Sequence, residues 1–420
     1  MRRSKFQFSV AIAGLLLTIS SGLMTPRSWA ADTSTVVLGG GNLLEGIPGE
    51  GTLKTSDIKA WLADPANHQP LQVALPEGLA AASDNIYIPE DNPITRAKIE
   101  LGRQLYFDTR LSSDTTISCA SCHIPDVGYA ATTRFGVGVD KQEGNRNSPV
   151  AYNRIISKAQ FWDGRADSLE AQAVGPIANP IEMGNTHDAC ILCLSGIPGY
   201  KMQFESIFPD GVTIDNVGKA IATFERTLVT GPAPYDAYQP LAQFEKVFAD
   251  DLEFLEDLRE EDPEFVKEYE GLQAAAAANP LTASAKRGMD LFFGKANCAT
   301  CHAGANFTDE QYHNLGVGMD AEEPDLGRFV VTKEEAMKGA FKTPTLRNIA
   351  LTAPYMHDGS QQTLEEVMVW YNKGGHPNPW LSDKMKPLNL TDAEITDVVN
   401  FMKQGLTGDL PPIETGRLPQ

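Results

Sequence analysis

The chain has 420 residues, which is long enough for two domains or more. Its formal net charge of −20 argues against binding to nucleic acid or to anionic membrane surfaces and favours a neutral or basic partner. An acidic surface that only keeps the protein soluble is an equally good interpretation of this charge.

The first thirty residues have the pattern of a cleavable export signal. Basic residues near the start precede an apolar run over 8–24, and Ser28-Trp29-Ala30 follows as a cleavage site. The apolar run is too short for a membrane span, and no later stretch is long enough to cross a bilayer. We therefore predict a signal peptide over 1–30 and a periplasmic protein without a membrane span.

Residues 31–90 contain no obvious metal or haem ligands. This N-terminal extension contains Gly39-Gly40-Gly41 and several prolines, which favour loops over regular elements. We predict an extended arm along the surface, with one short helix around Ile58 to Ala63.

Two Cys-x-x-Cys-His motifs are the most informative feature of the chain. They are Cys119-Ala-Ser-Cys122-His123 and Cys298-Ala-Thr-Cys301-His302. Two thiols at this spacing can add to the two vinyl groups of one haem, and the adjoining histidine then binds the iron. The alternative, a pair of redox dithiols or zinc half-sites, requires a neighbouring histidine by coincidence twice. The motifs therefore predict two covalently bound c-type haems.

A loose internal repeat surrounds these motifs. The segment 101–107 precedes the first motif as 287–293 precedes the second, and Trp162-Asp163-Gly164 is echoed downstream by His357-Asp358-Gly359. We predict short helices before each motif and after each echoed segment, at 168–173 and 363–371, joined by long loops. Strand signals are sparse. The predicted fold is mainly α, with two cytochrome-c-like domains over 91–235 and 281–410 that carry one haem each.

Residues 236–280 lie between the two predicted domains. Apolar residues recur here at helical spacing among many carboxylates, which predicts an acidic helical insertion with one amphipathic helix between Phe244 and Tyr269. Its acidic face could dock a basic electron donor or simply face solvent. Residues 411–420 are expected to form a C-terminal tail.

Several further motifs resemble those of one known family. They are Arg146-Asn147-Ser148-Pro149, Phe161-Trp162-Asp163-Gly164-Arg165-Ala166, Asn179-Pro180-Ile181-Glu182-Met183-Gly184, Pro344-Thr345-Leu346-Arg347-Asn348 and Ala353-Pro354-Tyr355-Met356-His357-Asp358-Gly359. From about residue 88 to 405, the chain resembles the bacterial dihaem cytochrome c peroxidase and MauG family. The resemblance implies a peroxide-reacting haem in the first domain, with His123 as ligand, and an electron-accepting haem in the second, with His302 as ligand.

The resemblance also implies roles for three side chains of the first domain. Glu182 is the implied catalytic acid and base, Gln172 the assisting amide, and Trp162 the tryptophan between the two haems. A carboxylate over an open iron could take the proton from the near oxygen of hydrogen peroxide and return it to the leaving oxygen. Packing of the domain interface is a second interpretation of Trp162, and both can hold.

Family members bind calcium between the domains through a side-chain oxygen and backbone carbonyls. By position, the corresponding residues are Asn147, Thr352 and Pro354. Their oxygen atoms are hard ligands of the kind that calcium prefers.

Two positions depart from the typical peroxidases of the family. Val139 stands where a histidine caps the first iron in the resting enzyme, so we predict an open first haem that needs no reductive activation. Tyr371 stands where the second haem has an axial methionine, as in the MauG branch, and Met356 and Met368 are alternatives. A phenolate stabilises ferric and higher iron, whereas a thioether raises the potential.

Cys190 and Cys193 form a third Cys-x-x-Cys pair, but Leu194 follows where a haem ligand would be needed. In an oxidising compartment a local disulfide is the leading interpretation, and a metal site with His187 is the alternative. The remaining histidines of the second domain, His313, His357 and His376, are expected to be structural or surface residues.

The sequence thus predicts a periplasmic oxidoreductase of the cytochrome-c-peroxidase type. It would reduce hydrogen peroxide to water with electrons from a small cytochrome c or a copper protein. The main alternative, favoured by Tyr371 and Val139, is a MauG-like enzyme that oxidatively modifies residues of a partner protein. A dihaem electron carrier without catalysis is a third class and needs a sixth ligand on the first haem. The sequence leaves open whether the chain forms a homodimer.

Overall fold

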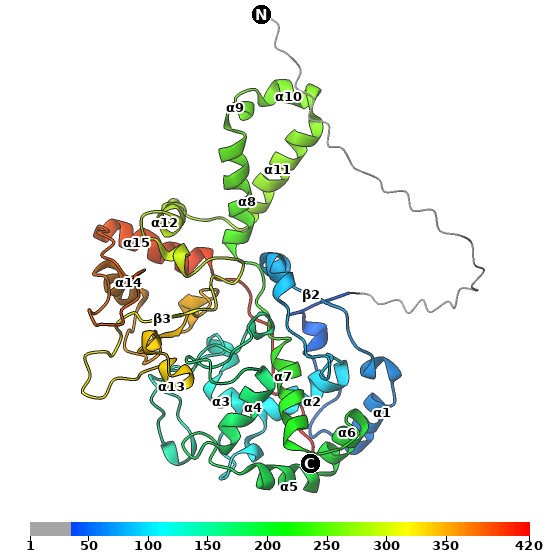
Figure 1. Ribbon diagram of the computed structural model, residues 1–420. Coiled ribbons are helices and arrows are strands. Elements are labelled where there is room, and N and C mark those ends of the chain that lie inside the picture. Colours follow the sequence, from blue (N-terminus) through cyan, green and yellow to red (C-terminus); the bar gives the residue numbers. More distant parts are fainter. Residues whose placement is uncertain (1–34) are drawn as a thin grey trace, which may run out of the picture. The chain divides into compact units, whose positions relative to one another are not determined.

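Helices and loops make up nearly all of the structure, as the sequence predicts (Figure 1). The computed structural model describes residues 35–420, so the predicted signal peptide over 1–30 lies outside the described residues. Within 35–420, no helix combines the length and the apolar character that crossing a membrane requires.

Between residues 35 and 225 the α-helices are α1 (Thr55–Leu62), α2 (Arg96–Phe107), α3 (Cys119–Cys122), α4 (Leu169–Ala178), α5 (His187–Gly196), α6 (Pro198–Ile207) and α7 (Ile214–Glu225). The later part contains α8 (Pro234–Val247), α9 (Ala249–Leu252), α10 (Leu255–Glu261), α11 (Pro263–Ala278), α12 (Ala283–Phe293), α13 (Phe329–Thr332), α14 (Leu364–Asn372) and α15 (Asp392–Asn400), which the π-helix η11 (Phe401–Gly405) continues. Two short sheets pair β1 (Val36–Val37) in parallel with β2 (Val73–Ala74), and β3 (Tyr312–His313) antiparallel with β4 (Phe341–Lys342).

Side-chain caps set where the helices around the haem motifs begin. Thr95 accepts a hydrogen bond from the Lys98 amide and starts α2. Ser168 and Thr363 cap α4 and α14 in the same way. Each cap satisfies an amide that has no partner within its helix. The helices predicted at 168–173 and 363–371 therefore form, and α4 continues beyond its predicted end to Ala178.

The internal repeat corresponds to two similar helix crossings, one in each half. In the first half α2 packs against α7, and a Cβ atom on Gly102 would lie 2.0 Å from the Ala220 carbonyl oxygen. In the second half α12 packs against α15, and a Cβ atom on Gly288 would lie 1.9 Å from the Asp397 carbonyl oxygen. Both glycines occupy the same place in the repeat because only a residue without a side chain lets the two helix backbones meet.

Gly288→Ala should therefore destabilise the second half. We expect the free energy of unfolding to fall by about 1–3 kcal/mol, because the added methyl group overpacks a backbone contact. Denaturant titration of the purified protein measures this change. Gly271→Ala in α11 is the matched control, since nothing lies within 4 Å of its added Cβ atom and we expect no loss of stability. Equal loss of stability in both variants would contradict the proposed role of Gly288.

Each half has its own hydrophobic core. The first core includes Leu105 and Tyr106 of α2 and Phe224 of α7, and the second includes Phe292 of α12 and Val398 of α15. The N-terminal extension also contributes buried leucines to the first core, among them Leu38, Leu43, Leu75 and Leu79. This segment contains the predicted short helix as α1 and is more than a surface wrapping, since its leucines complete the first core.

The acidic segment between the halves forms a hairpin of helices, so the predicted single helix from Phe244 to Tyr269 is wrong. Helix α8 ends at Val247 and α11 begins at Pro263, with α9 and α10 between them. Proline disfavours helix in the residue before it, and the Asp262 side chain caps α11 by accepting from the Phe265 amide. Phe244 stacks on Tyr269 across the hairpin, with ring centroids 5.6 Å apart.

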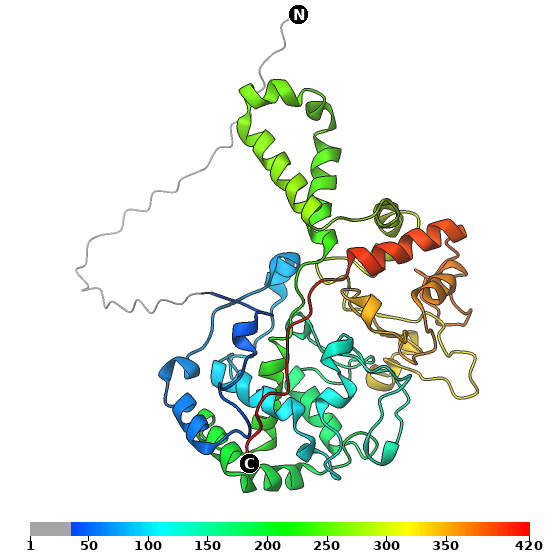
Figure 2. The ribbon, with the colours of Figure 1, turned by 180° about the vertical axis from the view of Figure 1, so that it is seen from behind.

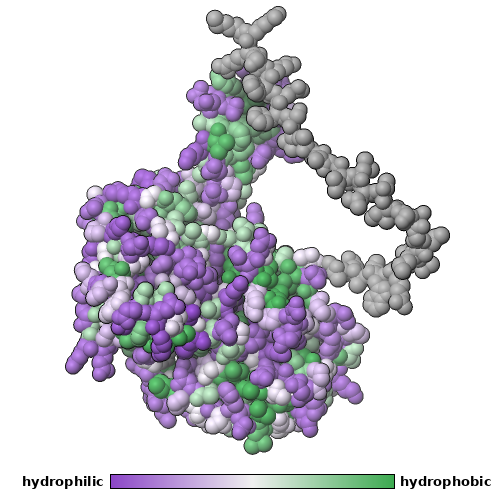
Figure 3. Space-filling model, in the orientation of Figure 1, coloured by the Kyte–Doolittle hydropathy of each residue, from purple (hydrophilic) through white to green (hydrophobic). Residues whose placement is uncertain are grey.

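The hairpin of α8 and α11 extends away from the helices around both haem motifs (Figures 1 and 2). Its surface is a mixture of hydrophilic and apolar areas (Figure 3). Val247 and Phe254 are 59% and 61% exposed there. The apolar positions at helical spacing thus divide between packing across the hairpin and exposure near its tip.

The C-terminal segment returns to the first half after α15 and η11 (Figures 1 and 2). The Tyr129 hydroxyl donates to the Pro411 carbonyl at 2.8 Å, and Arg110 donates to the Pro419 carbonyl at 2.9 Å. Arg417 donates to the Pro48 carbonyl at 2.7 Å. The last residues are therefore part of the first half's packing.

Candidate active site

A cavity of about 820 Å³ has residues of both haem motifs in its wall. The lining includes the attachment residues Cys122, His123, Cys298, Cys301 and His302, the candidate catalytic residues Trp162, Gln172 and Glu182, the candidate axial ligands Met356, Met368 and Tyr371, and the candidate calcium ligands Asn147, Thr352 and Pro354. Cys119 lies beside the lining and packs against the first core. The structure thus brings nearly all of the residues singled out in the sequence to one cavity.

The two histidines of the motifs have the environment that an iron ligand needs. His302 donates a hydrogen bond from Nδ1 to the Phe307 carbonyl at 3.0 Å, which leaves Nε2 with a free lone pair. The Nδ1 atom of His123 is buried and has no hydrogen-bond partner. Burial lowers the pKa of both imidazoles, so they are neutral and able to bind a metal. These residues fit haem iron at each motif.

The first motif folds into a short helical turn that gathers its thiols. The Ser121 hydroxyl accepts from the Ser118 amide at 3.0 Å, which begins α3 at Cys119. Residues three apart in a helix share one face, so Cys119 and Cys122 are neighbours. In the second motif, burial raises the pKa of Cys298 to about 12. Burial therefore favours the thiol form of this cysteine, which is the form that adds to a vinyl group.

The predicted disulfide between Cys190 and Cys193 is not formed. Both are free thiols on α5, where Cys190 is buried in the first core and the Cys193 sulfur contacts the Arg110 carbonyl at 3.8 Å. The side chains thus have separate partners. The alternative metal site with His187 is not assembled either: among the described residues, His187, Cys190 and Cys193 do not bring their ligand atoms together, and the His187 ring bonds to the Val174 carbonyl at 3.1 Å.

Glu182 is held in place by the turn that follows α4. Its carboxylate accepts from the Asn179 side-chain amide at 2.7 Å, and its backbone carbonyl accepts from the Val139 amide at 2.9 Å. Burial raises the pKa of Glu182, and the nearby Arg165 and the Asn179 hydrogen bond partly offset this effect. A half-buried carboxyl group with a raised pKa is a suitable proton acceptor and donor.

Gln172 lies on α4, the helix that leads to Glu182, and is half-buried in the cavity wall. Its amide can both donate and accept a hydrogen bond. One helix and its terminal turn therefore supply two of the three predicted catalytic residues.

Trp162 lies where the two halves meet. Its ring nitrogen donates to the Asn147 carbonyl at 2.8 Å, and its own carbonyl accepts from the Lys342 amide at 2.8 Å. Gly164 makes two further contacts at this seam, the interface between the two halves. It has φ +65° and lies against Tyr312, and its carbonyl accepts a hydrogen bond from Arg328 at 2.8 Å. Trp162 therefore has direct contacts to both halves.

Ion pairs continue this seam and end near Glu182. Arg146 bridges the halves, with Asp163 and Asp325 each 2.7 Å away. Asp163 also pairs with Arg165 at 3.2 Å, and the Arg165 guanidinium lies 3.5 Å from the centre of the Phe161 ring. Sequence reasoning did not single out Arg165, although it lies within a motif that includes Trp162. Its function depends on the distance to Glu182, which the motif alone does not reveal.

Replacing Arg165 with Gln should shift the pH dependence of peroxide turnover. Arg165 lowers the pKa of Glu182, so its removal raises that pKa. A base must be ionised to accept a proton, and the acidic limb of the kcat/KM profile should therefore move to higher pH. Arg165→Lys keeps the charge and should retain most of the wild-type profile. Identical profiles for the Gln variant and the wild type would exclude this role.

Tyr371 lies in the part of the cavity wall that is next to the second haem motif. It lies near the end of α14, close to Cys298 and Cys301, and burial raises the pKa of its phenol. Among the described residues, no group accepts a hydrogen bond from its hydroxyl. Met368 is 2% exposed and belongs to the second core, and Met356 has φ +71°. Of the three candidates, Tyr371 is the one that offers an oxygen ligand, from a half-buried side chain in the cavity wall.

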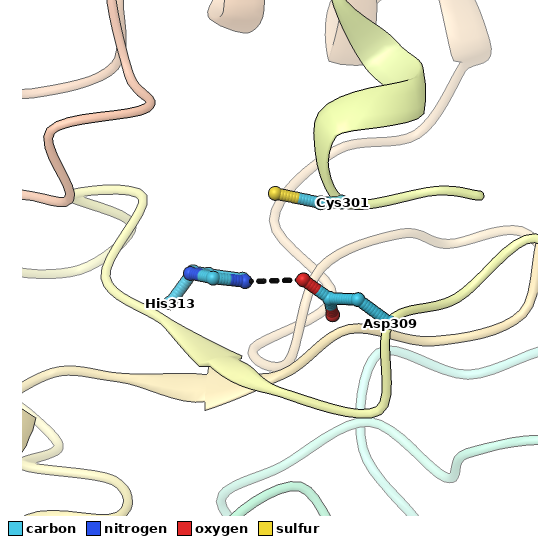
Figure 4. A group of neighbouring side chains, drawn as sticks. All are labelled: Cys301, Asp309 and His313. Carbon is cyan, nitrogen blue, oxygen red and sulfur yellow. Dashed lines mark hydrogen bonds and ion pairs between the residues drawn. The ribbon is translucent and has the colours of Figure 1, made fainter.

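His313 and Asp309 form a pair beside the second motif (Figure 4). The two side chains are 2.8 Å apart, and with the Cys301 sulfur they form a group whose ligand atoms lie within 4.8 Å of one another. Cys301 belongs to the haem motif, so this group is not independent of haem attachment. His357 is 6% exposed and stacks on Phe341 at 3.5 Å. His313 is therefore held by its pair with Asp309, and His357 by packing on Phe341.

Two family models match the chain. One, described as "Di-haem cytochrome c peroxidase", matches residues 96–243, and one described as "Cytochrome c" matches residues 285–405. The methylamine utilization protein MauG of Methylorubrum extorquens is 37% identical over 317 residues, which cover 75% of this chain and 80% of that protein. This chain belongs to the dihaem cytochrome c peroxidase and MauG family.

Two more members of the family support this assignment. Cytochrome c551 peroxidase of Nitrosomonas europaea is 35% identical over 346 residues, which cover 81% of this chain and 90% of the relative. The crystal structure of a MauG-like protein associated with microbial copper homeostasis matches with a TM-score of 0.63 and 28% identity, over 77% of this chain and 93% of that chain. The predicted family and the predicted enzyme class, an oxidoreductase of the cytochrome-c-peroxidase type with haem cofactors, are confirmed.

Proposed function

We propose that this protein is a periplasmic peroxidase that reduces hydrogen peroxide to water. A small cytochrome c or a copper protein would supply the electrons. The observation that carries the proposal is the half-buried carboxyl group of Glu182, which shares a cavity wall with His123. The relative named cytochrome c551 peroxidase supports this activity, and the predicted export signal supports the location.

The residues that would hold the cofactors are those of the two motifs. Cys119 and Cys122 would bind the first haem through thioether bonds, and His123 would bind its iron. Cys298, Cys301 and His302 would do the same for the second. When bound, the haems supply the redox chemistry that cleaves the O–O bond and passes electrons between the halves.

Proton movement during peroxide cleavage would depend on Glu182. Its carboxylate would take the proton from the near oxygen of peroxide and return it to the oxygen that leaves as water. The Asn179 amide would fix the carboxylate in one orientation, and Gln172 would orient peroxide as both donor and acceptor. Trp162, which contacts both halves, would serve as the stepping point for electrons between them.

Val139 supports a peroxidase that is open at rest. It is 4% exposed, and its amide is bonded to the carbonyl of Glu182. Its apolar side chain cannot bind iron. The loop that carries a capping histidine in typical family members would here leave the first haem free to accept peroxide without a reductive activation step.

Resting ferric spectroscopy of the holoprotein, followed by peroxide addition with and without a reduced cytochrome c, tests this function. We expect one high-spin haem, immediate reaction with peroxide and oxidation of the cytochrome. Two low-spin haems that do not react with peroxide would overturn the proposal and restore the electron carrier.

Tyr371 favours a second candidate function, a MauG-like oxidation of residues in a partner protein. A phenolate ligand would stabilise oxidised iron and so favour storage of oxidising equivalents. In that case the oxidised protein would persist after peroxide addition and would not react with the cytochrome. Tyr371→Phe tests the ligand itself: we expect loss of the near-infrared charge-transfer signature of the second haem, and an unchanged spectrum would exclude Tyr371.

The calcium site is a further part of the proposal. Asn147, Thr352 and Pro354 lie in one cavity wall, and the Asn147 side-chain nitrogen donates to the Arg134 carbonyl at 3.2 Å. This bond turns the amide oxygen away from Arg134 and leaves it for a cation. Calcium titration followed by calorimetry tests the site, with Asn147→Leu as the variant that should lose binding.

A further inference from the structure

Glu225, the last residue of α7, is a buried acid with no part in the proposed reaction. It is 5% exposed, and it lines the cavity that both haem motifs share. Its Oε2 atom is buried and has no hydrogen-bond partner. A buried carboxyl oxygen without a partner is costly, so its presence at a functional cavity calls for a physical explanation.

Two other glutamates show how this fold pairs the carboxylate of a buried or half-buried glutamate with hydrogen-bond donors. Glu100 is 3% exposed and accepts from Arg103 and Gln104, at 2.7 and 2.6 Å on one oxygen. Glu170 pairs with both terminal nitrogens of Arg226, at 2.6 and 3.0 Å. Glu225 has no such pair, although Arg226 follows it directly in the sequence.

The cations around Glu225 are already engaged. Arg226 is held by Glu170, and the Arg154 guanidinium donates to Gln160 at 2.8 Å and to Ser157 at 2.8 Å. The other titratable groups near Glu225 are Tyr106 of α2 and Cys119 of the first motif.

The ionisation of Glu225 falls close to neutral pH, so its carboxyl group can gain or lose a proton there. Burial raises the pKa of Glu225 to about 8, the Glu170 carboxylate adds to this rise, and the charges of Arg154 and Arg226 partly offset it. Cys119 would be bonded to the edge of the first haem, so a change of charge on that haem acts on Glu225 at short range through a medium of low dielectric constant.

We propose that Glu225 takes up one proton when the first haem is reduced and releases it when that haem is oxidised. One electron enters the site, one proton from solvent binds the Glu225 carboxylate, and the net charge of the buried site stays constant. Peroxide reduction consumes protons together with electrons. Glu225 would keep one of these protons close to the haem that receives the electron. The proposal rests on haem attachment at the first motif and does not depend on catalysis by Glu182.

Potentiometric titration of both haems in the holoprotein, across neutral and mildly alkaline pH, tests this proposal. We expect the potential of the first haem to fall with rising pH in the wild type and to lose this dependence in Glu225→Gln. The second haem is the internal control and should titrate alike in both proteins. Glu100→Gln, a variant of a buried but paired glutamate, should retain the wild-type dependence.

Redox-difference infrared spectra of the wild type give a second measurement that does not depend on a variant. At mildly alkaline pH, where the carboxyl group is ionised in the oxidised protein, we expect the carbonyl band of a protonated carboxyl group to grow on reduction and to be missing in Glu225→Gln. An unchanged pH dependence in Glu225→Gln, or a wild-type spectrum without a carboxyl band, would overturn the proposal. Loss of peroxide turnover in Glu182→Gln with an intact pH dependence would separate this proposal from the proposed catalytic function.

Discussion

Replacing Glu182 with Gln should lower kcat for peroxide reduction by about 10²- to 10⁴-fold, the usual contribution of a general acid and base. The amide keeps the size of the side chain and its bond to Asn179, but it cannot take the proton from peroxide. Stopped-flow measurement of cytochrome oxidation, with peroxide in excess, gives the rate. The spectrum of the first haem should stay the same, since no iron ligand is changed.

Glu143→Gln is the matched control for this experiment. Glu143 is an exposed glutamate that also lines the cavity, so its replacement changes the charge by the same amount without removing the buried carboxyl group. We expect at most a small change in rate. An equal loss in both variants would show that the general negative charge of the cavity matters, and Glu182 would no longer be the acid and base.

Asp236→Ala should cost about 3–5 kcal/mol of stability, because it leaves a buried guanidinium without its partner. The Arg347 side chain is 2% exposed, and two of its nitrogens lie 2.8 and 2.9 Å from the Asp236 oxygens. Its third nitrogen donates to the Ala305 carbonyl at 2.6 Å. Unfolding in guanidinium chloride, followed by circular dichroism, measures the loss.

An exposed ion pair of the hairpin is the control for this prediction. Arg259 and Glu270 lie 2.8 Å apart, with side chains that are 46% and 50% exposed. Glu270→Ala should change stability by at most about 1 kcal/mol, since water screens the charges. If Asp236→Ala were as mild as this control, the Arg347 pair would contribute little to the fold.

Local patterns were sufficient to predict the helices around the haem motifs. Gly102 and Gly288 mark equal positions of the repeat, and each lies at a helix crossing of the same kind. The resemblance to the family also placed Glu182 and Tyr371 at the cavity in which they lie. The helix predictions succeeded because cap residues and helical periodicity act over short stretches of chain, whereas the catalytic role of Glu182 and the ligand role of Tyr371 stay predictions.

Features that depend on distant contacts were beyond the sequence. The pair of Arg347 and Asp236 joins residues 111 positions apart. Glu225 carries no mark in the sequence, because its missing partner is a property of the packed interior. The acidic hairpin was predicted as one helix because hydrophobic periodicity alone does not show where Asp262 and Pro263 turn the chain.

The C-terminal segment affects the order in which the protein can mature. Pro411 and Pro419 provide acceptors for Tyr129 and Arg110, so the packing around the first haem motif is completed by residues that follow the second motif in the chain. The N-terminal half therefore cannot reach its final packing before the C-terminal segment is in place. We expect the thiols of the first motif to stay accessible for haem attachment until that segment docks.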